Sequence, residues 1–307
     1  MGAASSTALF ENELSAFRFI TVDGVRLRYL DRGSGTPVVL LHGNGSMIED
    51  FVASSIMDDA DTGHRFIAFD RPGFGYSERP PGRTWGPREQ ANLLRRALSQ
   101  LEVERPIVVG HSWGALVALA MALERAEDVA GLVLVSGHYY PIEATSALPA
   151  AFPFGIFVRR LMAADTVRHV FAPCIVSERF KKTFPLGLAM RLSQMQTVDD
   201  EAAMLFDAVN RLCRHYRELR VPVHLIAGSD DNIVDTRRHS ARLHEEIATS
   251  TFHRVPGCGH MVHHTAPAEV MAAIAAVGLA QSRERTAAIT NRLPRQWLRI
   301  GEGVVAA

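Results

Sequence analysis

The chain has 307 residues, of which 47% are hydrophobic and 21% charged, and its 33 basic and 33 acidic residues leave no formal net charge. This composition excludes a disordered chain, and the length is sufficient to bury a complete core. The basic residues are scattered, which argues against a nucleic-acid partner. The longest apolar runs, such as Val270 to Ala280, are shorter than the roughly 18 residues that a membrane span requires.

The number and spacing of the cysteines indicate a reducing compartment. Cys174, Cys213 and Cys258 make an odd count without a C-x-x-C spacing, which argues against a disulfide framework. The N-terminus shows no apolar stretch typical of a secretory signal. We therefore expect a cytoplasmic protein.

Short apolar runs alternate with helix-like stretches along most of the chain. A hairpin is expected first, because residues 17–22 and 25–30 flank the turn pair Asp23-Gly24. Continuous apolar runs, typical of strands covered on both faces, follow at 37–42, 65–70, 107–110, 131–136 and 221–227. Helix-like stretches lie between them at 88–100, 115–126 and 237–247. This alternation predicts an α/β fold with a mostly parallel sheet flanked by helices.

The alternation breaks between residues 138 and 217. This quarter of the chain shows no strand run, and prolines interrupt its helical patches. We expect a helical cap, inserted between two strands of a core formed by 17–137 and 218–280. Most aromatic residues of the insertion would form its own small core, but some, such as Phe152 and Phe154, could line an apolar substrate pocket. Residues 281–307, rich in arginine, are expected to form a C-terminal surface tail.

The segment Gly110-His-Ser-Trp-Gly114 carries the clearest chemical signal. It places G-x-S-x-G directly after a predicted strand and before a predicted helix, the context in which the serine sits on a sharp turn. Ser112 would then project from the carboxyl edge of the sheet at a helix N-terminus, which favours negative charge. His111, beside it, either lines the pocket or packs under the turn.

A serine hydroxyl needs a base to remove its proton and an acid to orient that base. His260 lies in a glycine-rich turn after the run 251–255, from which it can reach Ser112. The acid should end another strand, and Asp231 follows the run that ends at Gly228, with Asp230 as the alternative. Glu143, just after an earlier strand, is a weaker alternative. The order Ser112, Asp231, His260 is that of nucleophile, acid and histidine.

With these residues the chain resembles the α/β-hydrolase superfamily from about residue 17 to 280. The resemblance also rests on Leu41-His-Gly-Asn-Gly45, Asp70-Arg-Pro-Gly-Phe-Gly-Tyr-Ser77, Gly228-Ser-Asp-Asp-Asn-Ile-Val234 and Gly257-Cys-Gly-His260. It implies an α/β-hydrolase fold with the acid three positions beyond a glycine, which supports Asp231. It also implies an oxyanion hole formed by the backbone N–H groups of Asn44 and Trp113.

The identity of the nucleophile narrows the reaction. Superfamily members that open epoxides or displace halide attack through a carboxylate, so Ser112 disfavours those activities despite the adjacent Trp113. We expect a serine esterase that cleaves a carboxylic ester with an apolar portion through an acyl-enzyme. The same triad could serve a C–C bond hydrolase, a lactonase or amidase, or a cofactor-free perhydrolase. A ligand-binding protein on this fold is a further alternative.

His260, His263 and His264 form an H-x-x-H-H pattern that resembles a metal site. The sequence offers no cysteine or carboxylate at a metal-like spacing from them, and we expect no metal. Phosphate-binding and dinucleotide-binding loops are also lacking, so no organic cofactor is expected. The predicted partner is a small-molecule acyl substrate.

Overall fold

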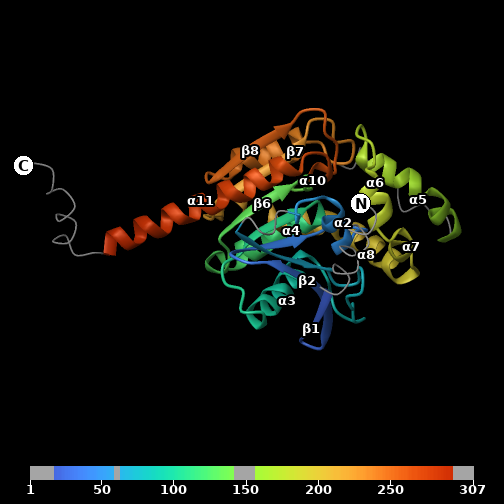
Figure 1. Ribbon diagram of the computed structural model, residues 1–307, viewed down its shortest axis with the longest axis horizontal. Helices are drawn as coiled ribbons and strands as arrows, with labels where there is room; N and C mark the ends of the chain where they lie inside the picture. Colours follow the sequence, from blue (N-terminus) through green and yellow to red (C-terminus); the bar gives the residue numbers. More distant parts are fainter. Residues whose placement is uncertain (1–16, 59–62, 142–155, 293–307) are drawn as a thin grey trace, which may run out of the picture.

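The computed structural model describes residues 17–58, 63–141 and 156–292. Its centre is an eight-stranded sheet in the order β1-β2-β4-β3-β5-β6-β7-β8 (Figure 1). Strand β2 runs antiparallel to both of its neighbours, β1 and β4, and all strands from β4 along the sheet to β8 are parallel to one another. The strands are β1 (Phe17–Val22), β2 (Val25–Gly33), β3 (Thr36–Leu41), β4 (His64–Phe69), β5 (Ile107–His111), β6 (Gly131–Val135), β7 (Val223–Gly228) and β8 (Ser250–Val255). The predicted parallel α/β architecture is confirmed.

Both faces of the sheet are covered, which explains the continuous apolar runs of its strands. Because successive side chains of a strand point to opposite faces, Val39 and Leu41 of β3 pack in the cluster with helices α3 (Pro87–Gln100) and α4 (Trp113–Glu124). Val38 and Leu40 pack on the other face, in the cluster with α2 (Ile48–Ala53) and α11 (Pro267–Arg292). The sheet is therefore the rigid middle layer that carries the site on its carboxyl edge.

All the described elements between β6 and β7 are helical. They are α5 (Ile156–Phe171), α6 (Glu178–Thr183), α7 (Leu186–Ala189), α8 (Leu192–Leu212) and the 3-10 turn η2 (Tyr216–Glu218). Helices α5 to α8 gather at one side of the sheet, on the right in Figure 1. The cap at 138–217 stays a prediction.

The remaining helical segments are short. They are the short turn η1 (Ala126–Asp128), the π-turn η3 (Arg237–Ala241), α9 (Arg242–Glu246) and α10 (Val262–Thr265). Helix α11 continues to residue 292, so the predicted tail begins inside a helix, and residues 293–307 lie outside the described residues. Among the described residues, no helix has both the length and the apolar character of a membrane span.

Candidate active site

Ser112 occupies a sharp turn between strand β5 and helix α4. Its backbone has φ 53° and ψ −115°, a strained conformation that L-residues rarely adopt. Glycines make the turn possible, because a Cβ at Gly110 would lie 2.5 Å from the carbonyl oxygen of Gly114. A Cβ at Gly114 would lie 2.1 Å from the carbonyl oxygen of Leu41. The geometry explains why glycine flanks the serine on both sides, and it puts the serine at the N-terminus of a helix.

Asp231 and His260 meet at the same edge of the sheet. Nδ1 of His260 donates to Oδ2 of Asp231 over 2.9 Å, because a carboxylate oxygen can only accept. The other carboxylate oxygen, Oδ1, accepts the backbone N–H groups of Ile233 and Val234 over 2.8 and 2.9 Å. Both ionisable side chains are almost fully buried. This arrangement fixes the imidazole so that Nε2 is the nitrogen able to accept a proton.

Asp230, the alternative acid, does not share this environment. Its side chain is exposed, whereas only 1% of the Asp231 side chain is exposed. The backbone N–H of Asp230 binds the carbonyl oxygen of Cys258, which joins the acid loop to the histidine loop. The other alternative, Glu143, lies outside the described residues. The structure therefore brings the histidine to Asp231.

The predicted oxyanion donors lie on two neighbouring segments. Trp113 opens helix α4, and Asn44 follows the end of strand β3. Within the described part of the chain, the backbone N–H of neither residue donates a hydrogen bond. A Cβ at Gly43 would lie 3.1 Å from Cβ of Ser112, so the loop that carries Asn44 passes directly over the serine. The oxyanion hole formed by these two N–H groups stays a prediction.

A buried arginine fixes that loop. The Arg71 guanidinium donates to the carbonyl oxygens of His42 and Gly43 over 2.8 and 3.0 Å. The same side chain forms an ion pair with Glu201 of helix α8 and a hydrogen bond with Gln90 of helix α3. All of these charged groups are fully buried. Arg71 lies within the motif 70–77, but no local pattern in the sequence reveals its contact with Glu201, which lies 130 residues away.

The amide of Asn44 adds a second connection to the cap. Its Nδ2 donates to the carbonyl oxygen of Val198 in α8 over 3.1 Å. Gln194 of the same helix accepts the backbone N–H of Gly75 over 3.0 Å. Helix α8 is thus joined by polar contacts to the loops that follow β3 and β4.

The three proposed pocket residues have different outcomes. His111 is buried, and its Nε2 donates to the carbonyl oxygen of His260 over 3.3 Å. This position fits the packing alternative for His111. Phe152 and Phe154 lie outside the described residues. A separate hollow of about 600 Å³ opens between helix α8 and the loop 73–85, and none of the proposed catalytic residues lines it.

Another histidine, His138, lies close enough to Asp231 to interact with it electrostatically, and it stands in none of the sequence motifs. His138 follows β6 and packs with its ring centroid 5.0 Å from that of His239. Burial lowers the pKa of His138 to about 3, with further lowering from the neighbouring His239 and His260. Burial also lowers the pKa of His239, to about 4. Both imidazoles are therefore neutral at pH 7.

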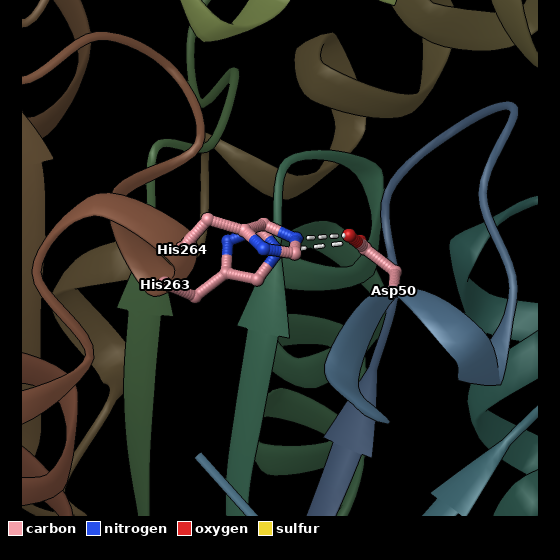
Figure 2. Close-up of side chains that lie close together, drawn as sticks. All are labelled: Asp50, His263 and His264. Carbon is pink, nitrogen blue, oxygen red and sulfur yellow. Dashed lines mark hydrogen bonds and ion pairs between the residues drawn. The ribbon is translucent and has the colours of Figure 1, made fainter. Parts of the chain in front are cut away.

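Among the residues that the structure describes, the group that could offer metal ligands is Asp50, His263 and His264, rather than the three histidines of the H-x-x-H-H pattern. One atom from each of these three side chains lies within 4.8 Å of the others, and hydrogen bonds join both histidines to Asp50 (Figure 2). His260 belongs to Asp231 instead. Asp50 supplies the carboxylate of this group. It precedes His263 by 213 residues, so no short spacing in the sequence reveals it.

The sheet order, the serine turn and the acid–histidine pair together define an α/β hydrolase. A family model described as the alpha/beta hydrolase family matches residues 38–273, and the chain belongs to this family.

Two relatives of known activity cover most of the chain. The 2-hydroxy-6-oxo-2,4-heptadienoate hydrolase of Pseudomonas putida is 28% identical, and the match covers 80% of this chain and 90% of that protein. Haloalkane dehalogenase 2 of Mycobacterium tuberculosis is 27% identical, over 81% of this chain and 90% of its own. Among solved structures, the meta-cleavage product hydrolase CumD of Pseudomonas fluorescens superimposes with a TM-score of 0.69 at 21% identity, covering 87% of this chain and 99% of that one. The latter likeness concerns the fold.

Proposed function

We propose that this hydrolase cleaves a carboxylic ester of a small molecule with an apolar portion, using Ser112 as nucleophile, His260 as base and Asp231 as the acid that orients it. The observation that carries the proposal is the buried hydrogen bond between Asp231 and His260 at the edge where Ser112 is presented. Attack on the carbonyl carbon forms a bond to Oγ of Ser112 as the serine proton passes to Nε2 of His260.

The negative charge that develops on the carbonyl oxygen is stabilised by the backbone N–H groups of Asn44 and Trp113. The alcohol leaves with the proton from His260, and a water activated by the same imidazole then releases the acid. Loss of a single oxyanion donor lowers kcat about 10²–10³-fold in serine hydrolases. The hydrogen bonds that hold the Asn44 loop, from Arg71 to the carbonyl oxygens of His42 and Gly43, support this role.

Hydrolysis of a 2-hydroxy-6-oxo-dienoate is the second candidate. It is favoured by the 28% identity, over most of both chains, to the hydrolase from Pseudomonas putida that carries this substrate class in its name. Dehalogenation is disfavoured despite the relative from Mycobacterium tuberculosis, because a serine hydroxyl at position 112 would form a stable ether with an alkyl halide, whereas an aspartate there forms a hydrolysable ester.

Steady-state rates on a substrate panel test the proposal. We expect the wild type to hydrolyse p-nitrophenyl esters, with higher kcat/KM for hexanoate than for acetate, and Ser112→Ala to lose at least about 10³-fold in kcat while it keeps the far-UV circular dichroism of the wild type. A 2-hydroxy-6-oxo-dienoate and an alkyl halide complete the panel. Undiminished ester hydrolysis by Ser112→Ala would contradict the proposal. Faster turnover of the dienoate than of any ester would favour the second candidate, and saturable binding without product would indicate a ligand-binding protein.

A further inference from the structure

Two short helices begin directly after residues of the proposed active site. Helix α2 (Ile48–Ala53) begins four residues after Asn44, and helix α10 (Val262–Thr265) begins two residues after His260. A contact that fixes α2 relative to α10 therefore also fixes the oxyanion loop relative to the proposed base.

Asp50 of α2 makes such a contact with both histidines of α10. Its Oδ2 lies 3.2 Å from Nε2 of His263, and its Oδ1 lies 2.6 Å from Nε2 of His264 (Figure 2). At most 2% of each of the three side chains is exposed. Burial alone would raise the pKa of Asp50, but the two histidines outweigh it and hold that pKa well below its usual range. The carboxylate is therefore ionised and accepts an N–H from each imidazole.

His111, the neighbour of Ser112, extends this network to the nucleophile. Its ring centroid lies 4.4 Å from that of His263 and 4.8 Å from that of His260. Its Nε2 donates to the carbonyl oxygen of His260 over 3.3 Å. Contacts thus run without a break from Asp50 through His263 and His111 to His260, and they join the segments that carry Asn44, Ser112 and His260.

The spacing between Asp50 and His264 identifies a hydrogen bond rather than a shared metal ion. Two ligands on one tetrahedral zinc, each about 2.0–2.1 Å from the ion, are roughly 3.3 Å apart, whereas Asp50 and His264 are 2.6 Å apart. A metal-bound imidazole also donates its second N–H to a partner. Nδ1 of His263 is buried and has no hydrogen-bond partner among the described residues.

We propose that Asp50 is a positioning residue of this hydrolase, which acts through His263, His264 and His111 to hold His260 in register with the oxyanion loop. The inference rests on the proposed function, since it concerns the same site. A displacement of about 1 Å between reacting groups can lower a rate about 10²-fold. Loss of the carboxylate should therefore lower kcat with little change in KM, because Asp50 is buried beneath the site and does not contact substrate.

The test compares Asp50→Ala, Asp50→Asn and the control Asp31→Ala, with active sites counted by fluorophosphonate titration. Asp31 is matched because its carboxylate also accepts two hydrogen bonds, both from Arg65 near the amino end of strand β4, at the opposite edge of the sheet. We expect Asp50→Ala to lose about 10²-fold in kcat with KM within about threefold of the wild type. Asp50→Asn should recover part of this loss, because its amide oxygen can still accept from Nε2 of His264. Asp31→Ala should leave both constants unchanged.

Hydrogen exchange, measured by mass spectrometry, tests the positioning role of Asp50 without relying on ester hydrolysis. Asp50→Ala should exchange faster than the wild type in residues 44–54 and 258–266 together, and Asp31→Ala should not. This result would support the positioning role even if the wild type hydrolyses no ester, an outcome that would contradict only the proposed function. If Asp50→Ala does not fold, His264→Phe removes one donor while it keeps the ring contacts to Phe171 and Phe180, and the same loss confined to kcat is expected.

The inference is overturned by wild-type kcat per active site in a folded Asp50→Ala or His264→Phe variant, or by unchanged exchange in both segments. A loss of kcat in Asp50→Ala that Asp50→Asn does not recover at all would also contradict positioning by hydrogen bonds. Stoichiometric zinc in the purified wild type that is absent from Asp50→Asn would replace the inference with a metal site.

Discussion

The two carboxylate oxygens of Asp231 accept hydrogen bonds from different groups. Oδ1 accepts the N–H groups of Ile233 and Val234 and so shapes the acid loop, while Oδ2 accepts from Nδ1 of His260. The loop geometry and the orientation of the base can therefore be separated by an amide substitution, because an asparagine keeps Oδ1 but replaces Oδ2 with a donor.

We predict that Asp231→Asn folds normally but loses about 10⁴-fold in kcat, as the corresponding change does in other serine triads, because its NH2 forces the proton of His260 onto Nε2. The matched control is Asp230→Asn, because the side chain of Asp230 is exposed and does not take part in the pair of Asp231 and His260. Ester hydrolysis rates of both variants check this. If Asp230→Asn loses more activity than Asp231→Asn, the acid has been assigned to the wrong residue.

Helix α8 is held against the core by charges rather than by an apolar stripe alone. Glu201 is fully buried and pairs with the buried Arg71, which in turn holds the oxyanion loop. Its neighbour Asp200 pairs with Arg79, but 60% of the Asp200 side chain is exposed. Adjacent residues of one helix thus offer a buried and an exposed ion pair for comparison.

Glu201→Ala should lower the free energy of unfolding by about 3–5 kcal/mol, because it leaves the Arg71 charge buried without its carboxylate. Asp200→Ala should change the free energy of unfolding by less than about 1 kcal/mol, since exposed pairs contribute little. Urea denaturation of the two variants and the wild type measures the difference. Similar losses in both variants would show that burial does not govern this interface.

Prediction from sequence succeeded for elements with a local pattern. The Asp23-Gly24 turn, with both residues at positive φ, forms the expected hairpin, and each predicted strand is found within two residues of its expected start. The stretch 237–247 forms the π-turn η3 followed by α9 rather than one α-helix. Helix α2 was not anticipated, because six residues are too few to show a helical period.

The residues of the candidate site also differ in whether a local sequence pattern predicts them. Ser112, Asp231 and His260 each stand in a short motif, and the sequence predicts all three at the carboxyl edge of the sheet because parallel strands end there; the structure pairs Asp231 with His260. Asp50 pairs with His263 across 213 residues, and Arg71 pairs with Glu201 across 130. Such pairs depend on packing in three dimensions, and a single sequence contains no local pattern that links them.

The molecule as a whole buries several neutral histidines, and this makes its stability depend on pH. Burial lowers the pKa of His138 to about 3 and of His239 to about 4, below the value near 6.5 of an unfolded histidine. The unfolded chain therefore binds more protons between pH 6.5 and 4, so these groups stabilise the fold above pH 6.5 and lose that contribution as the pH falls. Asp70 acts in the opposite direction, because burial raises its pKa to about 6.

We predict that the free energy of unfolding falls between pH 7 and pH 5, and that His239→Asn reduces this fall by about 2 kcal/mol relative to the wild type. The asparagine can still accept the Tyr139 N–H that Nδ1 of His239 accepts over 3.0 Å, while it does not titrate. Urea denaturation at the two pH values checks this. An equal fall in both proteins would mean that His239 does not contribute to the acid sensitivity.

Covalent labelling with a fluorophosphonate, followed by peptide mass spectrometry, tests whether Ser112 is an activated nucleophile. We expect one adduct, on Ser112, in the folded wild type, much slower labelling in His260→Ala, and none in Ser112→Ala. A folded wild type that is not labelled, or labelling that persists in Ser112→Ala, would contradict this role of Ser112.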